Sequence, residues 1–393
     1  MLLCLLPVLA CGPKKSPTTT PEPQGEAVEP AAPVDPIPDD LGALTPQLVV
    51  VDIPTALDFY GKAFGAQTLY TINGPDGAPM HAEIKIGDSV LMIDSVQEGM
   101  KDPMALGGSP VTLMLYVEDA DAAFATATEA GAVVNMPLED MFWGDRYGQL
   151  VDPFGHAWAV ATHMEDLTDE QMQQRMELLP PPPKKGKKTR KPKKGKAPKW
   201  ASVEGTPAAQ KVPEGYHSVT MSLTVSDAAK AIEFYTTVFG ATERSRMPTA
   251  DGRLLHAELD IGGDVLMLAD EFPEMGGTSA ATLGGSPVTI HHYVEDAEAT
   301  FAKATDNGAT AVMPLAVMFW GDRMGAVVDP VGFPWSIATH VEDVPPEQME
   351  ERMKAQMAAE GAAGGDPTAE GAEDGEGAEA EGDDEADEAE PEA

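Results

Sequence analysis

The hexapeptide Met-Phe-Trp-Gly-Asp-Arg occurs twice in this chain, at Met141–Arg146 and at Met318–Arg323. The copies begin 177 residues apart, since 318 minus 141 is 177. A repeat of that length is as long as a whole domain, so it indicates that a domain was duplicated within the 393 residues. Residues that both copies keep can therefore be compared with residues that differ between them.

Composition divides the chain around this duplication. Four consecutive prolines and a lysine-rich tract separate the repeats, a composition typical of an extended linker. The C-terminal end is mostly Glu, Asp, Ala and Gly, which bury too little apolar surface to fold, so we expect it to be disordered. The expected organisation is a signal peptide (1–11), a disordered tether (12–42), a first domain (43–166), a linker (167–212), a second domain (213–345) and an acidic disordered tail (346–393).

The N-terminal residues predict the compartment. A short apolar run, too short to span a bilayer, ends in Val-Leu-Ala-Cys-Gly at 8–12, which resembles a bacterial lipobox. This resemblance implies lipidation of Cys11 and a membrane-anchored protein of the cell envelope. An ordinary signal peptide that contains cysteine is the alternative. The only cysteines are Cys4 and Cys11, so we expect no disulfide in the folded part.

Charge limits the partners. The chain has 26 basic and 65 acidic residues, a net charge of −39, which disfavours nucleic-acid binding. The lysine-rich linker is the exception. It could contact anionic head groups, other envelope polyanions or the acidic tail, or act only as a solvated spacer.

Apolar periodicity predicts the order strand, helix, three strands, twice in each repeat. In the first repeat the expected helices span 56–64 and 119–131, each ending at a glycine. The expected strands are 47–51, 67–72, 80–86, 89–93, 111–117, 132–136, 146–151 and 156–162.

Several short segments recur in register in both repeats. They include His81-Ala82-Glu83 and Tyr116-Val117-Glu118-Asp119, together with the repeated hexapeptide, Asp152-Pro153, and Asp58-Phe59-Tyr60, which is Glu233-Phe234-Tyr235 in the second repeat. With the βαβββ order, this combination resembles the vicinal oxygen chelate superfamily of glyoxalase I, bleomycin-resistance proteins and extradiol dioxygenases, and is most similar to its PhnB-like branch. The resemblance implies an α+β fold of two tandem domains, each with two βαβββ modules forming a curved mixed sheet cup. It also implies that the two domains pair with each other.

The resemblance further implies where a catalytic divalent metal would bind. Three of the four ligand positions are occupied in both repeats by residues that are poor metal ligands: Thr45 and Thr220, Thr112 and Thr289, Ala159 and Ser336. Only Glu83 and Glu258 keep a ligand type. We therefore expect no metal cofactor. The alternative is a Zn, Fe, Mn or Ni site that uses His81, Glu83, His256 and Glu258 with a further ligand from elsewhere.

The His and Glu of each pair are two apart on a strand, so they share a face and are candidates for lining a ligand site even without metal. Three further residues kept in both repeats are candidates for ligand recognition. Their tryptophan can stack on a flat molecule and their arginine can hold an anion, as Trp143, Asp145 and Arg146, and as Trp320, Asp322 and Arg323. The alternative is an Arg–Asp ion pair that holds the loop, with the tryptophan packed over it.

The sequence thus predicts a tandem-domain lipoprotein that binds a small molecule without the standard metal site. The alternative function is a metal-dependent lyase, isomerase or dioxygenase of the same superfamily. A third hypothesis, an envelope scaffold, accounts for the charged segments but not for the repeated hexapeptide.

Overall fold

The computed structural model describes residues 34–38, 41–74, 76–97, 99–179 and 198–363. Each repeat contains two βαβββ modules, as predicted. Those of the first repeat are β1 (Leu44–Val50), α1 (Ile53–Phe64), β2 (Gln67–Asn73), β3 (Pro79–Ile86) and β4 (Ser89–Ser95), then β5 (Val111–Tyr116), α3 (Ala120–Ala130), β6 (Val133–Asp140), β7 (Asp145–Val151) and β8 (Ala157–His163). Those of the second are β11 (Val219–Val225), α5 (Ala228–Phe239), β12 (Thr242–Pro248), β13 (Leu254–Ile261) and β14 (Asp264–Asp270), then β15 (Val288–Tyr293), α7 (Ala297–Asp306), β16 (Thr310–Val317), β17 (Asp322–Val328) and β18 (Pro334–His340).

The four helices of the βαβββ modules, α1, α3, α5 and α7, begin in the same way. An aspartate at each N-cap accepts a hydrogen bond from a backbone N–H of the first turn, which satisfies a donor that the helix itself cannot pair. Three of these helices end at a glycine with positive φ, Gly65, Gly131 and Gly240, where a side chain would strain the backbone.

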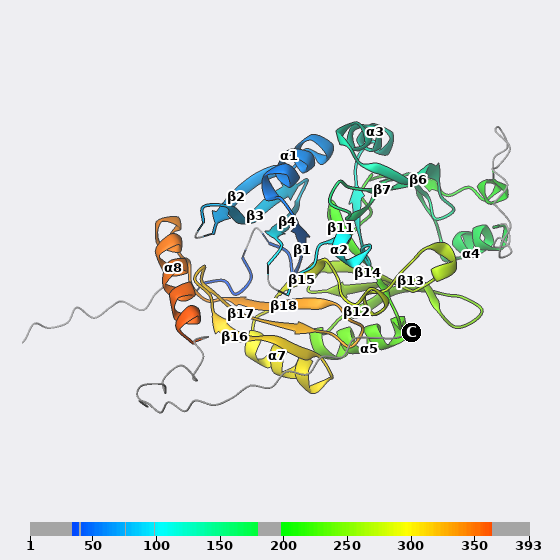
Figure 1. Ribbon diagram of the computed structural model, residues 1–393. Coiled ribbons are helices and arrows are strands. Elements are labelled where there is room, and N and C mark those ends of the chain that lie inside the picture. Colours follow the sequence, from blue (N-terminus) through cyan, green and yellow to red (C-terminus); the bar gives the residue numbers. More distant parts are fainter. Residues whose placement is uncertain (1–33, 39–40, 75, 98, 180–197, 364–393) are drawn as a thin grey trace, which may run out of the picture. The chain divides into compact units, whose positions relative to one another are not determined.

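The strands form two eight-stranded mixed sheets, and each sheet combines modules from both repeats (Figure 1). Sheet A has the order β16-β17-β18-β15-β1-β4-β3-β2, and sheet B has the order β12-β13-β14-β11-β5-β8-β7-β6. Antiparallel pairing of β1 with β15 joins the repeats in sheet A, and pairing of β11 with β5 joins them in sheet B. The predicted fold of two sheets, each with two βαβββ modules, is confirmed. Both of the sheets cross the repeat boundary.

The helices cover one face of each sheet and leave the other face open. Alternate strand residues such as Leu48, Leu91 and Ile290 are fully buried in the core against the helices. Because strand side chains alternate between faces, the intervening residues lie on the open face. α1 packs against α3, and α5 packs against α7, so each helix pair lies within one repeat. Only the pairings of β1 with β15 and of β11 with β5 join strands of different repeats among the described residues.

A buried aspartate completes each core. Asp152 Oδ2 accepts hydrogen bonds from Tyr60 Oη at 2.9 Å and from Trp158 Nε1 at 3.0 Å, while Oδ1 accepts from two backbone N–H groups of the turn. The second repeat has the same arrangement around Asp329. Paired in this way, a buried carboxylate holds the turn and the last strand together.

Short elements connect and extend the modules. They are α2 (Pro103–Leu106), β9 (Glu165–Asp166), α4 (Asp169–Glu177), η1 (Lys199–Ser202), β10 (Thr206–Pro207), η2 (Pro273–Met275), α6 (Ala280–Leu283) and α8 (Pro346–Ala363). The linker expected at 167–212 therefore contains α4, η1 and β10. Because Arg175 of α4 is buried and donates hydrogen bonds to the carbonyls of Phe142 and Val203, this part of the linker is anchored to the domain.

The expectation of disorder throughout 346–393 is wrong for its first part, because α8 occupies Pro346–Ala363. Met353 of this helix is buried and Arg352 pairs with Glu342 at 2.6 Å, so tertiary contacts stabilise it despite the acidic composition. The signal peptide, the lipidation site Cys11, most of the tether and residues 364–393 lie outside the described residues. Within the described part, no helix is both long and apolar enough to cross a membrane.

Candidate functional site

The repeated hexapeptide forms a turn that enters β7 in the first repeat and β17 in the second. The backbone N–H of Met141 donates to the carbonyl of Asp145 at 2.8 Å, and that of Gly144 donates to the carbonyl of Met141. Gly144 has φ +103°, and a Cβ there would lie 2.4 Å from the carbonyl oxygen of Glu165. Only glycine fits this turn.

The aspartate of the hexapeptide organises the residues around it. Asp145 is buried and accepts hydrogen bonds from Tyr116 Oη at 3.0 Å and Trp143 Nε1 at 3.1 Å, and its Oδ1 lies 2.8 Å from His163 Nδ1. The hydrogen bond to Asp145 is the main cause that raises the pKa of His163. Asp322 has the same contacts with Tyr293, Trp320 and His340 in the second repeat. The two tryptophans are therefore oriented by a carboxylate.

The arginine of the hexapeptide points elsewhere. Arg146 pairs with Asp121 at 2.7 Å and with Asp140 at 3.2 Å, and Arg323 pairs with Glu298 at 3.0 Å. These acidic partners lie on helices α3 and α7 and on β6. The structure thus brings the tryptophan and aspartate of the candidate recognition cluster together and separates the arginine from them.

A cavity of about 360 Å³ lies on the open face of sheet A, which we call cavity A. Its lining comes from both repeats and from α8, and it includes Tyr70, Phe319 and Trp320. Seven methionines also line it: Met80, Met92, Met100, Met313, Met318, Met324 and Met349. Flexible thioether side chains adapt to irregular apolar ligands, and the volume lies in the range of small-molecule sites.

The polar residues of cavity A include the predicted His81 and Glu83. His81 Nδ1 lies 2.7 Å from Asp94 Oδ1, and its Nε2 lies 4.0 Å from Glu83 Oε1. Burial by itself lowers the pKa of His81, but hydrogen bonds to Asp94 and Glu83 outweigh burial and raise it to about 9. Tyr70 Oη donates to Glu83 at 2.5 Å, and Gln47 Nε2 donates to Asp94. Each of these side chains is therefore held by a neighbour.

His291 on β15 is the functional candidate that sequence comparison missed. It is 4% exposed, lines cavity A, and its Nε2 has no hydrogen-bond partner among the described residues. Burial is the main cause that lowers its pKa to about 4. The equivalent residue of the first repeat is Met114, 177 positions earlier, so a search for residues kept in both repeats discards His291. Strand alternation from Tyr293 would have placed it on the open face.

The positions that the family resemblance assigned to a metal do not form a metal site. On sheet A they are Thr45, Glu83, Thr289 and Ser336, and on sheet B they are Thr220, Glu258, Thr112 and Ala159. One carboxylate with hydroxyl or methyl groups does not fit the N/O donor set of a catalytic divalent cation. Across the described ranges, no group of three or more His, Cys, Asp or Glu residues is placed to hold a metal ion.

The open face of sheet B carries the equivalent residues but is packed differently. His256 Nε2 lies 2.9 Å from Glu258 Oε1 on β13. Trp143 lies just before β7 and Asp145 begins it, in the module that the first repeat contributes to sheet B. Tyr116, Tyr147, Ala159 and Ala161 form a hydrophobic cluster here, which we call cluster B. Val212 and Tyr216, which precede β11 in the chain, pack against it.

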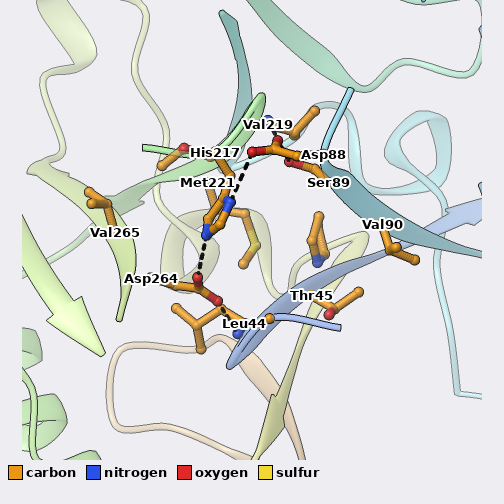
Figure 2. Close-up of a pocket in the computed structure, with 13 residues that line it drawn as sticks. Leu44, Thr45, Asp88, Ser89, Val90, His217, Val219, Met221, Asp264 and Val265 are labelled. Atoms are coloured by element: carbon orange, nitrogen blue, oxygen red, sulfur yellow. Dashed lines mark hydrogen bonds and ion pairs between the residues drawn. The ribbon is translucent and has the colours of Figure 1, made fainter. Parts of the chain in front are cut away.

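A second, much smaller cavity lies where β1 and β4 of sheet A meet β11 and β14 of sheet B. Figure 2 shows His217, one of its lining residues, between Asp88 and Asp264. The distances are 3.3 Å to Asp88 and 2.9 Å to Asp264. The cavity volume of about 60 Å³ suits a few water molecules and not an organic ligand. We therefore assign these residues to the junction of the two sheets and not to the binding site.

Comparison with known proteins agrees with this geometry. The family model described as Glyoxalase/Bleomycin resistance protein/Dioxygenase superfamily matches residues 42–160 and 216–337. These two ranges cover more than half of the chain, which therefore belongs to this superfamily.

Individual relatives resemble one third of the chain. An uncharacterized protein of Mycobacterium tuberculosis (strain ATCC 25618 / H37Rv) is 46% identical over 139 residues, which are 34% of this chain and 82% of that protein. An uncharacterized protein of Arabidopsis thaliana is 32% identical over 136 residues, 32% of this chain and 81% of that protein. Among solved structures, glyoxalase I from Zea mays is similar with a TM-score of 0.48 and 14% identity, covering 75% of this chain and 92% of that one.

Proposed function

We propose that the protein binds a small organic molecule in cavity A without the metal ion used by catalytic members of the superfamily. The observation that carries this proposal is a cavity of about 360 Å³ lined by methionine and aromatic side chains. His291 belongs to this lining, and its buried Nε2 lacks a partner among the described residues. A buried polar atom without a partner costs free energy, and a ligand that pairs with it recovers that free energy.

The charges around cavity A favour an uncharged or cationic ligand. Among the described residues, its lining contains three carboxylates, Glu83, Asp94 and Asp322, and no lysine or arginine. His81, protonated at neutral pH, balances one of these charges. Trp320 and Tyr70 offer aromatic faces, which attract cations. An anionic ligand would meet repulsion.

The proposal includes the finer predictions from the sequence. We infer a PhnB-like member of the superfamily, anchored in the cell envelope through a lipid on Cys11. Under this proposal the binding site faces the envelope and takes up small molecules there. Loss of fatty-acid labelling in a Cys11→Ala variant would support the anchor.

The competing function, a metal-dependent enzyme, would require His81 and Glu83 to bind a metal with further ligands. Metal analysis of the purified protein distinguishes the two functions. Stoichiometric Zn, Fe, Mn or Ni that disappears on His81→Ala would contradict metal-free binding.

Two fluorescent probes of opposite charge test ligand binding directly. Thioflavin T is a flat cation, and 8-anilinonaphthalene-1-sulfonate is an anion. We expect saturable binding of thioflavin T at one site per chain, with Glu83→Gln weakening it about tenfold, which corresponds to about 1.4 kcal/mol. His291→Met, which copies the residue of the first repeat, should also weaken it.

Glu258→Gln is the matched control, because it makes the same change on the packed face of sheet B. It should leave thioflavin T binding unchanged. Equal loss in both variants, or tighter binding of the anionic probe than of thioflavin T, would contradict the proposed site and its charge preference.

A further inference from the structure

The described residues before the two sheets make equivalent backbone hydrogen bonds. Before β11, the N–H of Tyr216 donates to the carbonyl of Pro213 and closes a turn. Before β1, the N–H of Leu41 donates to the carbonyl of Pro38 in the same way. Each segment also pairs with the end of a last strand, through Lys211 with His163 and through Pro36 with His340. Leu41 and Tyr216 therefore occupy equivalent places, one before each sheet.

Tyr216 is held at the open face of sheet B from several sides. Its ring meets that of Tyr116 edge-on at 5.6 Å between centroids, and the Arg244 guanidinium lies 5.5 Å from the Tyr216 ring centroid. Burial first, and then the charge of Glu258 with a hydrogen bond to it, raise the pKa of the Tyr216 phenol. Arg244 also donates to the carbonyls of Glu214 and Gly215, which fixes the turn that carries Tyr216.

The surroundings of Tyr216 are the counterpart of cavity A. Tyr116, Tyr147, Met114, Met136, Met141 and Trp143 belong to cluster B or pack against it, as Tyr216 does. Their equivalents, 177 residues later, are Tyr293, Met324, His291, Met313, Met318 and Trp320. All six equivalents line cavity A. On sheet A, the residues at these positions surround a cavity. On sheet B, the residues at the equivalent positions pack together with Tyr216.

We propose that Tyr216 acts as an internal ligand that closes a second binding site on sheet B, and that the residue at this position decides whether each sheet accepts a small molecule. Leu41 leaves the face of sheet A open, whereas the larger Tyr216, clamped by Arg244 and Glu258, fills the face of sheet B. The second site would take an uncharged aromatic molecule, because Arg244 and Glu258 balance each other there. This inference rests on the proposed function, the binding of a small molecule in cavity A.

Reciprocal substitutions in the full chain test the proposal. The probe is N-phenyl-1-naphthylamine, an uncharged aromatic fluorophore, and the readout is the number of probe molecules bound per chain at saturation. We expect one for the unchanged protein, two for Tyr216→Leu, none for Leu41→Tyr, and one again for the double variant. Tyr216→Phe keeps the ring in place and should still bind one.

Near-ultraviolet circular dichroism and the melting temperature show whether each variant is folded. A folded Tyr216→Leu variant that binds no more probe than the unchanged protein would overturn the inference, as would unchanged binding by Leu41→Tyr. The Leu41→Tyr result stands even if Tyr216→Leu does not fold. If the unchanged protein binds no probe, binding in cavity A is contradicted, while a site gained in Tyr216→Leu would still support closure by Tyr216.

Discussion

Two histidines on the open face of sheet A are driven in opposite directions by their surroundings. His81 has Asp94 and Glu83 as partners, which outweigh the effect of burial and raise its pKa to about 9. For His291, burial is the largest effect and lowers the pKa to about 4, although the charge of Asp322 acts in the opposite direction. At neutral pH, cavity A is therefore lined by one cationic imidazole, that of His81, and by one neutral imidazole, that of His291.

The protonation of His81 makes stability depend on pH. Because its folded-state pKa lies above the unfolded value of about 6.5, its contribution to stability is fully present below about pH 6.5 and is lost as pH rises through about 9. We expect the free energy of unfolding to fall by roughly 3 kcal/mol across this window, because the two pKa values differ by about 2.5 and each pKa unit corresponds to about 1.4 kcal/mol. Urea unfolding at several pH values measures it.

Asp94→Asn is the control for this pH dependence. This substitution should lower the pKa of His81. It should therefore remove most of the loss of stability between about pH 6.5 and 9. An NMR titration of the imidazole that gives a pKa below 7 in the unchanged protein would contradict the role of Asp94.

At the level of elements, α4 and α8 show how one position can differ between repeats. Arg175 of α4 is 1% exposed, pairs with Glu165, and lies 5.2 Å from the centroid of the Trp200 ring. Its equivalent on α8 is Arg352, whose side chain is 35% exposed and pairs with Glu342 at 2.6 Å. The buried arginine therefore anchors its helix more strongly than the exposed one.

This difference predicts unequal effects of one substitution. Arg175→Met should lower the free energy of unfolding by about 3 kcal/mol, because it removes a buried cation and leaves the carbonyls of Phe142 and Val203 without their donor. Arg352→Met should change the melting temperature little, because solvent screens an exposed pair. Equal effects in the two variants would show that burial does not determine how much each arginine contributes to the free energy of unfolding.

Across the whole molecule, the two repeats are joined by strand pairing and not only by the linker. β1 pairs with β15 over five residues, from Leu44 to Leu48, and β11 pairs with β5 over five, from Val219 to Leu223. The hydrophobic core also contains residues from both repeats. Separating the repeats would expose four strand edges, on β1, β15, β11 and β5, and much of the core.

Cleavage between the repeats should therefore leave them associated. A protease site inserted within residues 180–197 allows the chain to be cut after folding. We expect the two fragments to elute together in size-exclusion chromatography in the absence of denaturant and to separate in urea. Separation without denaturant would contradict the pairing across repeats.

Local sequence patterns predicted most helices and strands of the βαβββ modules and their order. Strand alternation, aspartate caps and glycine ends are properties of short segments, and they predict the βαβββ order and most element positions in the first repeat. The sequence also predicted that His81 and Glu83 share a face, because strand periodicity alone requires it. Helix α8 was missed because its stability comes from contacts with the domain and not from its own composition.

Periodicity and the repeated hexapeptide were enough to predict a duplicated chain in which each repeat has two βαβββ modules, because both signals are local properties of the sequence. The tertiary structure alone decided which modules share a sheet, because periodicity identifies two faces of a strand but not its partner. It also decided that Arg146 points away from the hexapeptide's aspartate and that His291, absent from the first repeat, lines the cavity. Tyr216 lies 55 residues or more from the strand residues of cluster B, since 216 minus 161 is 55, so only the folded chain brings them together.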